Sequence, residues 1–420
     1  MSNCPVKRAS GVPIQSAFFL VLIAVWGIAE GRSQRLTPAQ IPIPSTFFGM
    51  HIHHLISGNE PNPPTPWPQV TVPAWRLWDV RVTWTDLEPA KGQWKFDVLD
   101  RVLELAREHD TQVQLTFGFT PAWASTRPTE ASLYRPGGAA EPRSLDDWTS
   151  FVRTVAIRYQ GRIHTYEIWN EPNIPRYWSG SPEQMVELAR LAHDAIKGID
   201  PSAIIVAPSP VGEAGLVWLS SFLNAGGAHY VDVIGFHFYV FPAPPEAMVA
   251  LINSVKAIMR GYGVSDKPLW DTEAGWSKPS PFPSDEVAAG YLARAFVLNW
   301  ASGVQRFYWY AWDNHGWAAL RTTEPDNRTL TPAGTTYGII QKWLTGAVVN
   351  WCEQDVNQNW TCQLKDHAKD EWIVWNPNQS SCMVVPSHWS VKNVTPLLSS
   401  THAAGDGCVE VGPTPALLTP

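Results

Sequence analysis

Eight short apolar runs of strand length recur along the sequence, separated by segments such as 182–199 in which apolar residues repeat at helical spacing. Strands that alternate with helices build a parallel sheet covered by helices. Eight such units over residues 36–345 predict a (β/α)8 TIM barrel. The expected strands are residues 46–54, 75–79, 112–119, 163–169, 203–207, 231–240, 268–273 and 305–312.

A doubly wound sheet is the alternative arrangement of the same elements. Its dinucleotide-binding form has no support, because no Gly-x-Gly-x-x-Gly follows the first expected strand. The net charge of −7 and the lack of a long basic run argue against nucleic acid as a partner. The 23 Trp residues favour a carbohydrate ligand, although core packing also accounts for many of them. The oligomeric state stays open.

The composition of the sequence changes after the expected barrel, where short apolar runs are separated by Asn, Pro, Ser and Gly. Residues 346–420 are expected to form a small β-domain packed on the barrel, with a frayed tail from Gly412. Four of its residues are the cysteines Cys352, Cys362, Cys382 and Cys408. An even number in an exported chain predicts two disulfides, with three possible pairings. A zinc site is the alternative, but no C-x-x-C pair supports it.

The first 31 residues resemble a secretory signal peptide. Lys7 and Arg8 form a positive start, residues 17–29 form an apolar run, and small residues follow. The apolar run is too short for a membrane span, so no stable span is expected after cleavage. An uncleaved anchor is the alternative. The predicted location is therefore secreted or periplasmic.

Two carboxylates stand at the ends of expected strands. Glu171 follows the fourth strand, where Pro172 stops the ladder, and Glu273 ends the seventh. The carboxyl ends of barrel strands meet at one mouth, so both side chains can enter one cleft. Paired carboxyl groups are what glycoside hydrolysis needs. A separation of about 5–5.5 Å would mean retention of configuration, and about 6.5–9.5 Å inversion.

The run Trp-Asn-Glu-Pro-Asn at 169–173, with a second Glu at the end of the seventh strand, resembles the clan A glycoside hydrolases. Within the clan, three stretches most resemble family 39 and the related family 5 cellulase-like enzymes. They are residues 76–79 (Arg-Leu-Trp-Asp), residues 84–92 (Trp-x-x-Leu-Glu-Pro-x-x-Gly) and residues 166–173. The resemblance covers residues 45–345 and implies the same barrel.

The resemblance also implies roles for individual residues. Glu171 matches the acid/base and Glu273 the nucleophile of a retaining reaction. Asn170 matches the residue that hydrogen-bonds the sugar 2-hydroxyl, and Arg76 the residue that supports the nucleophile. A cation near Glu273 would keep that carboxylate ionised. The structural alternative for Arg76 is an ion pair with Asp79 or another carboxylate.

Aromatic residues and a histidine complete the expected sugar site. The resemblance implies that Tyr239 hydrogen-bonds the nucleophile, that His237 lines the cleft and that Trp312 is a sugar platform. From their places soon after the two catalytic positions, Trp178 and Trp276 are expected to form further subsites. Core packing is the alternative for each of these residues.

His51 and His53 lie two residues apart on the first expected strand and therefore face the same side. This pair resembles the metal-binding pair of the amidohydrolases, with His237 and Asp313 as further ligands. No His stands on the fifth strand, and this interpretation leaves both glutamates without a role. We therefore expect His53 to bind sugar hydroxyls at the mouth, with plain packing as its alternative.

The sequence thus predicts an exported retaining glycoside hydrolase that acts on a β-linked poly- or oligosaccharide without a metal or organic cofactor. The loops at 61–73 and 126–143 could wall a cleft, which favours endo action. An exo-acting β-xylosidase-like enzyme is the main alternative. A metal-dependent amidohydrolase and a non-catalytic carbohydrate-binding protein are the others.

Overall fold

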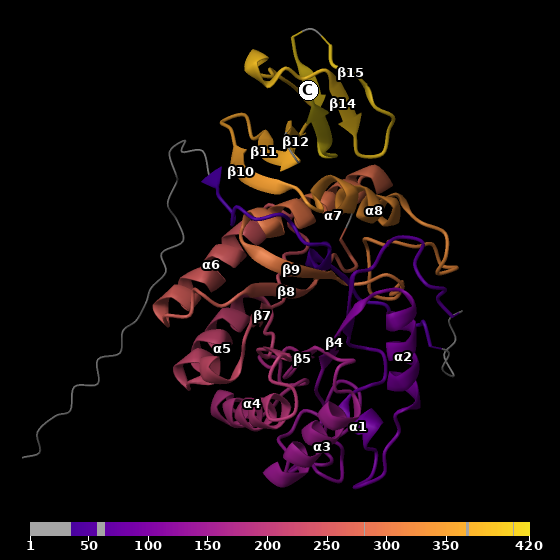
Figure 1. Ribbon diagram of the computed structural model, residues 1–420, viewed down its shortest axis with the longest axis vertical. Helices are drawn as coiled ribbons and strands as arrows, with labels where there is room; N and C mark the ends of the chain where they lie inside the picture. Colours follow the sequence, from indigo (N-terminus) through magenta and orange to yellow (C-terminus); the bar gives the residue numbers. More distant parts are fainter. Residues whose placement is uncertain (1–34, 57–63, 281, 367–368, 406) are drawn as a thin grey trace, which may run out of the picture.

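The computed structural model describes residues 35–56, 64–280, 282–366, 369–405 and 407–420. The predicted signal peptide at 1–31 lies outside these residues. Figure 1 shows a barrel of strands ringed by helices, with a second sheet of orange and yellow strands beyond α7 and α8. Among the described residues, no helix combines the length and the apolar character that a membrane crossing requires.

The barrel contains eight parallel strands in the order β6-β5-β4-β3-β2-β9-β8-β7. The gap between β6 and β7 is bridged by the isolated pairs Val206–Val233 and Val211–His237, which nearly close the barrel. The predicted (β/α)8 fold is therefore confirmed. The strands are β2 (Phe48–Met50), β3 (Ala74–Leu77), β4 (Gln112–Thr116), β5 (Thr165–Glu167), β6 (Ile204–Val206), β7 (Ile234–Phe236), β8 (Leu269–Ala274) and β9 (Val304–Trp309).

Three helices of the barrel, α4, α7 and α8, begin at a residue whose side chain caps the helix. In α4, Ser181 accepts a hydrogen bond from the Gln184 backbone N–H, and Pro182 occupies the first turn, where its missing N–H costs nothing. The helices are α1 (Trp84–Leu87), α2 (Asp97–Glu108), α3 (Leu145–Arg158), α4 (Pro182–Lys197), α5 (Gly212–Asn224), α6 (Ala247–Gly261), α7 (Asp285–Ala301) and α8 (Pro332–Leu344).

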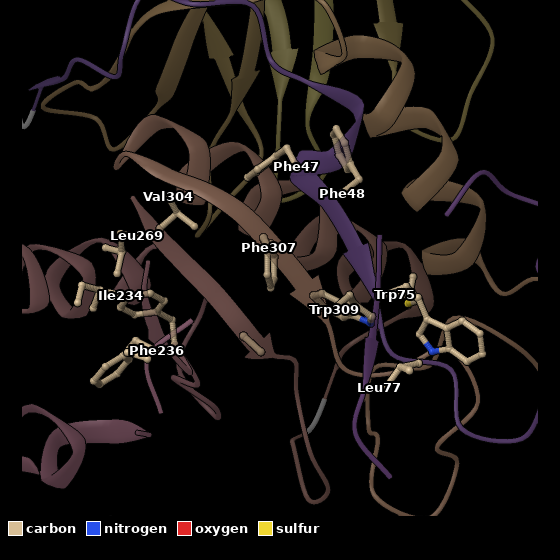
Figure 2. Close-up of a cluster of buried hydrophobic side chains, with 14 of the residues drawn as sticks. Phe47, Phe48, Trp75, Leu77, Ile234, Phe236, Leu269, Val304, Phe307 and Trp309 are labelled. Atoms are coloured by element: carbon tan, nitrogen blue, oxygen red, sulfur yellow. The ribbon is translucent and has the colours of Figure 1, made fainter. Parts of the chain in front are cut away.

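Strand alternation separates the helix-facing core from the polar barrel interior. In β3, Trp75 and Leu77 belong to the main apolar core, whereas Arg76 points to the opposite side and is fully buried. Figure 2 shows part of this core, with Phe48 and Phe307 among the labelled side chains. The inward side of the strands therefore carries charged and polar groups at the end of the barrel where the site forms.

The C-terminal domain is a seven-stranded sheet in the order β1-β10-β11-β12-β17-β14-β15, with a two-stranded sheet of β13 and β16. Its first strand, β1 (Arg35–Leu36), comes from before the barrel and pairs with β10. The other strands are β10 (Val348–Gln354), β11 (Trp360–Asp366), β12 (Lys369–Trp375), β13 (Ser381–Met383), β14 (Asn393–Pro396), β15 (His402–Ala403), β16 (Val409–Val411) and β17 (Ala416–Thr419).

Two disulfides staple this domain, as predicted. Cys352 bonds Cys362 across β10 and β11, and Cys382 bonds Cys408. All four thiols are used, so the zinc alternative has no ligands. The expectation of a frayed tail was wrong, because β17 pairs with both β12 and β14 and buries Leu418 completely.

Contacts with α6 and α7 hold the C-terminal domain on the barrel. The indole Nε1 of Trp375 donates to Glu246 Oε1 at 2.8 Å, and Arg294 Nη1 donates to the same oxygen at 3.0 Å. Ile373 and Trp375 of β12 belong to the same apolar cluster as the barrel core. One face of the second sheet is therefore continuous with the barrel.

Candidate active site

The carboxyl ends of the barrel strands bring the predicted catalytic residues into one group. Arg76 lies in β3 and Glu273 in β8, while Asn170 and Glu171 follow β5. His237 follows β7 directly. These residues come from four different strands, which is the usual composition of an active site at this face of a barrel.

Glu171 and Glu273 face each other across the mouth. A carboxylate oxygen of each lies within 4.8 Å of the other, and a ring nitrogen of His237 lies within the same distance of both. The two residues are only 8% and 6% exposed. Carboxyl groups about 5–5.5 Å apart are typical of retaining glycosidases, because one group must reach the sugar directly. An upper bound of 4.8 Å between one oxygen of each group favours the shorter of the two expected separations.

Arg76 joins three side chains of the site through one buried guanidinium. Its Nη1 donates to Glu273 Oε2 at 2.8 Å, and its Nη2 donates to Asn170 Oδ1 at 2.8 Å. Its Nε donates to Glu167 Oε2 at 2.6 Å. The structure therefore gives Arg76 the expected contact with Glu273, and its second carboxylate partner is Glu167 rather than Asp79.

Glu167 is the residue of this network that sequence reasoning missed. It is fully buried and also accepts hydrogen bonds from Gln114 Nε2 at 2.9 Å, Thr116 Oγ1 at 2.7 Å and Ser209 Oγ at 2.5 Å. Although burial opposes it, the Arg76 guanidinium holds the pKa of Glu167 below its ordinary value. A charged residue inside an apolar strand was the available signal, because buried charges are almost always paired.

Asn170 presents a free donor toward the site. Its Oδ1 accepts from Arg76, which fixes the orientation of the amide group. Its Nδ2 is buried and has no acceptor among the described residues. A buried donor without a partner is costly, and a ligand hydroxyl would satisfy it. This geometry suits the sugar contact expected for Asn170.

Tyr239 and His237 each contact one of the two carboxylates. The Tyr239 hydroxyl donates to Glu273 Oε1 at 2.8 Å. Burial and the Glu273 charge raise the pKa of Tyr239 well above its usual range, so it stays a donor. His237 Nδ1 lies 3.0 Å from Glu171 Oε1. Burial lowers the pKa of His237 to about 4, so the ring is neutral at neutral pH.

The donors around the two glutamates decide which one keeps a proton. Burial raises the pKa of both Glu171 and Glu273 to about 7. Glu273 is contacted by Arg76 and Tyr239, which both favour its ionised form, whereas the Glu171 carboxyl has, among the described residues, the neutral His237 imidazole as its one hydrogen-bond partner. The two carboxyl groups titrate as a coupled pair. These contacts favour the first negative charge on Glu273 and the remaining proton on Glu171.

The backbone of Glu171 is held in an unusual conformation. Its φ of 43° lies in the left-handed region, which costs an ordinary residue about 1–2 kcal/mol. Two backbone hydrogen bonds maintain it: the Glu171 N–H donates to Ser209 O, and the Ile174 N–H donates to Glu171 O, both at 2.9 Å. Strain of this kind gathers at functional sites, where it fixes the direction of a side chain.

A cavity of about 570 Å³ lies among the loops at this face of the barrel, and neither Glu171 nor Glu273 lines it. The loops that follow β2, β3, β4 and β9 form its wall, and His53, Trp78, Phe119 and Tyr134 are among the lining residues. Its volume is in the range of small-molecule sites, and it combines aromatic faces with polar groups. The loop at 126–143 contributes Tyr134, as expected for a wall of the cleft.

Asp79, which lines this cavity, accepts hydrogen bonds from two tyrosines. Its Oδ2 accepts from the Tyr310 hydroxyl at 2.8 Å, and its Oδ1 accepts from the hydroxyl of Tyr134. Tyr134 and Asp79 line the cavity, whereas Glu171 and Glu273 do not. Besides burial, the charge of Asp79 raises the pKa of Glu171, so the Tyr134–Asp79–Tyr310 bridge lies close to the buried carboxylates.

His53 is placed where it can contact a ligand. It lines the cavity, and its buried Nε2 has no partner among the described residues. Its backbone N–H donates to Asp313 Oδ1 at 2.9 Å, which fixes this segment. His51 instead is fully buried, with its Nε2 3.1 Å from Thr272 O.

One group of three potential metal ligands occurs among the described residues, formed by Glu171, His237 and Glu273. The Arg76 guanidinium, 2.8 Å from Glu273, would repel a cation bound there. The amidohydrolase interpretation needs His51 in such a group, and His51 lies outside it. The donor set therefore does not fit that interpretation.

Comparison with known families places this geometry in context. Residues 67–311, more than half of the chain, match the model of glycosyl hydrolases family 39. The chain belongs to this family. The predicted resemblance to clan A enzymes of the family 39 type is thereby confirmed.

The curated relatives of this family 39 chain align over part of their length. A beta-xylosidase of Geobacillus stearothermophilus is 24% identical over 232 residues, which are 49% of this chain and 46% of the relative. An alpha-1,4-L-rhamnosidase of Formosa agariphila is 26% identical over 175 residues, 37% of this chain and 34% of the relative. The chain thus spans less than half of either relative.

Solved structures of family 39 share the fold. A family 39 glycoside hydrolase from the gut symbiont Bacteroides cellulosilyticus WH2 superposes with a TM-score of 0.70 at 16% identity, covering 90% of this chain and 81% of that one. A family 39 beta-xylosidase from Caulobacter crescentus gives a TM-score of 0.62 at 16% identity, covering 91% and 98%. At this identity the likeness establishes the architecture.

Two of the Trp residues expected as subsites lie in the core of this family 39 barrel. Trp178 and Trp276 are 2% and 1% exposed. Trp178 packs against Trp169 and Trp276 against Trp309, at ring distances of 5.1 and 5.9 Å. Neither ring presents a face to the 570 Å³ cavity. Both therefore occupy the packing position that was their alternative.

Two Trp residues, Trp312 and Trp317, follow the eighth barrel strand, where the sequence predicted Trp312 as a sugar platform. Neither lines the 570 Å³ cavity. Trp312 is 1% exposed and lines a separate cavity of about 170 Å³. Trp317 is half-buried and packs edge-on against Tyr239 and Tyr310, at 5.5 and 5.0 Å. Trp317 thus packs on the tyrosine that contacts Glu273.

Proposed function

We propose that this family 39 chain is a retaining glycoside hydrolase that cleaves β-glycosidic bonds of a poly- or oligosaccharide. The observation that carries the proposal is the buried pair of Glu171 and Glu273, with carboxylate oxygens within 4.8 Å and unequal hydrogen-bond donors. Glu273 is the nucleophile and Glu171 the acid/base. The family assignment and the cavity at the same face of the barrel support this conclusion.

In the first step, Glu273 attacks the anomeric carbon while Glu171 donates its proton to the departing glycosidic oxygen. Arg76 and Tyr239 keep the attacking carboxylate ionised and aimed. The bond from the anomeric carbon to the leaving oxygen breaks as the ester bond to Glu273 forms. Asn170 Nδ2 can donate to a hydroxyl of the same sugar.

In the second step, Glu171 takes a proton from water, whose oxygen attacks the same carbon and releases Glu273. The pKa of Glu171 then matters again, because the group must accept a proton as readily as it gave one. The neutral His237 ring suits both roles, since its Nδ1 can accept from the acid or donate to the carboxylate, depending on the tautomer.

The position of cleavage along the chain is the finer part of the proposal. The sequence predicted endo action, which the wall formed by the 126–143 loop supports. Exo action of the β-xylosidase type is the second candidate. It is supported by the 24% identity to a beta-xylosidase and by the Tyr134–Asp79–Tyr310 bridge, which joins the loops after β3, β4 and β9 at this face of the barrel.

The proposed location is secreted or periplasmic. The two disulfides of the C-terminal domain support it, because such bonds persist in oxidising compartments. Expression with residues 1–31 in a bacterial host, followed by fractionation and N-terminal sequencing, tests this proposal. Intact protein that stays in the cytoplasm would contradict it.

The activity is tested on a panel of aryl β-glycosides and β-linked polysaccharides, with products separated by size. The wild type should hydrolyse at least one substrate class, and Glu171→Gln should lose most turnover on substrates with poor leaving groups. Early products of mixed length indicate endo action, and monosaccharides alone indicate exo action. Hydrolysis that Glu171→Gln leaves intact contradicts the assignment of the acid/base.

A further inference from the structure

The C-terminal domain carries a groove of about 340 Å³ that the catalytic reaction does not use. It lies at the β11–β12 hairpin and at the short turn η3 (Ser387–Trp389). The side chains that line it combine two indole rings with an amide, an ammonium, a carboxylate and an imidazole. They belong to Gln363, Lys369, Asp370, Trp372, His388 and Trp389.

The groove is on the side of the sheet turned away from the barrel. Successive side chains of a strand point to opposite faces. In β12, Ile373 and Trp375 pack in the cluster shared with the barrel, whereas Trp372 and Val374 belong to a separate small cluster. Gln363 of β11 is directly opposite Trp372 and shares its face. This face is therefore not an extension of the catalytic cavity.

The two indole rings form a rigid flat surface in this groove. Trp389 stacks on Trp372 with ring centroids 4.5 Å apart and ring planes 5° from parallel. Trp372 is 3% exposed and lies beneath Trp389, which is half-buried. The turn below is fixed by hydrogen bonds from the Trp389 N–H to Pro386 O at 3.0 Å and from Ser390 to Ser387.

Polar side chains surround this surface. Among the described residues, the side chains of Gln363, Asp370 and His388 make no hydrogen bond, whereas Lys369 interacts electrostatically with Glu371. Lys369 and Asp370 carry opposite charges, so the groove does not favour a polyanion such as nucleic acid or an anionic membrane surface. A neutral ligand with flat apolar faces and many hydroxyl groups fits this combination, and a glycan chain has these properties.

We propose that this groove is a second carbohydrate-binding site, in which a sugar unit of a β-linked polysaccharide stacks on Trp389. The Gln363 amide and the charged pair beside it bind the hydroxyls. The C-terminal domain then holds the enzyme on a polymer while the barrel acts on it. The inference rests on the proposed carbohydrate substrate for the class of ligand, but not on the catalytic roles of Glu171 and Glu273.

The site is tested by affinity electrophoresis of the full chain in gels containing soluble xylan, β-glucan or mannan. At least one polymer should retard the wild type. Trp389→Ala should weaken that binding about tenfold, because a Trp side chain can bury on the order of 150–250 Å². Its kcat/KM on a small aryl β-glycoside should equal that of the wild type, since the groove is separate from the carboxylates.

Two further variants make the result decisive. Trp351→Ala is the matched control, because Trp351 is a half-buried indole of the same domain that packs against Arg35 outside the groove. Gln363→Ala leaves the indole stack in place and should weaken binding severalfold, so it decides the outcome if Trp389→Ala unfolds. Unchanged retardation of Trp389→Ala or Gln363→Ala overturns the proposal.

The wild type itself provides the last outcomes. A chain that no polymer retards, even one that it hydrolyses, has no second glycan site, and the proposal is then wrong while the proposed function stands. Light scattering tests whether the groove instead forms a contact between two copies of the chain. If Trp389→Ala dissociates a dimer and leaves polysaccharide binding unchanged, the groove is a contact between copies of the chain.

Discussion

Replacing Glu171 by Gln should make the protein more stable at alkaline pH. Gln has nearly the same shape as Glu and can keep the contact with His237 Nδ1, which lies 3.0 Å from Glu171 Oε1. It carries no charge, however. Burial raises the pKa of Glu171 from an ordinary value of 4.5 to about 7, which means that the folded protein resists its ionisation.

The size and sign of the effect follow from proton linkage. Between pH 4.5 and pH 7 the folded chain holds a proton at Glu171 that the unfolded chain has lost, so the free energy of unfolding falls as the pH rises. The pKa of Glu171 differs by about 2.5 between the unfolded chain (4.5) and the folded chain (about 7). At 1.36 kcal/mol for each pH unit, this difference corresponds to about 3 kcal/mol. The Gln variant has no ionisable group at this position, so its free energy of unfolding does not fall in this way. Its advantage over the wild type should therefore grow by about 2–3 kcal/mol between pH 5 and pH 8.

Urea unfolding at pH 5 and pH 8, followed by tryptophan fluorescence, measures this difference. Glu104→Gln is the control, because Glu104 is exposed on α2 and its side chain contributes little. The stability of the control relative to the wild type should be the same at both pH values. An advantage of Glu171→Gln that does not grow with pH would refute the raised pKa, and with it the reason given for Glu171 as the proton donor.

Two further predictions test the buried network and the disulfides. Glu167→Gln removes a negative charge that raises the pKa of Glu171. The alkaline limb of the pH profile of kcat/KM should therefore move to lower pH. If Glu167 has only a structural role, the variant should lose activity without any shift of this limb. Replacing Cys382 and Cys408 by Ser opens a cross-link of sequence separation 26, which should cost about 2–4 kcal/mol in denaturant unfolding of the C-terminal domain but leave aryl glycoside turnover unchanged.

The barrel and the carboxylate pair could be predicted because their signals are local. Each strand is a short apolar run closed by a turn, and Glu171 stands where Pro172 ends such a run. The barrel fold then places the ends of β5 and β8 at the same mouth. The contact of Arg76 with Glu273 also depends only on strand ends, and the structure contains it.

Other parts of the site depend on packing that the sequence does not encode locally. Trp178 and Trp276 follow catalytic positions in the chain, but their rings turn into the core. Whether an indole near a strand end points inward or outward is decided by the neighbouring loop. The Tyr134–Asp79–Tyr310 bridge joins segments that are far apart in the sequence, so the local sequence around these residues does not predict it.

The structure of the C-terminal tail also could not be predicted from its local sequence. A four-residue strand, β17, follows a stretch rich in Pro and Gly, and its sequence alone suggests a loose end. Two neighbouring strands, β12 and β14, supply hydrogen-bond partners on both of its edges. Tertiary pairing therefore overrides a weak local preference.

The central claim is that Glu273 forms a covalent bond to the sugar. An activated 2-deoxy-2-fluoro glycoside of the preferred sugar slows release of such an intermediate, and peptide mass spectrometry of the inactivated enzyme locates the label. We predict one glycosyl group per chain, attached to Glu273. An enzyme that hydrolyses the parent glycoside but carries the label on another residue, or forms no labelled species, would contradict the account.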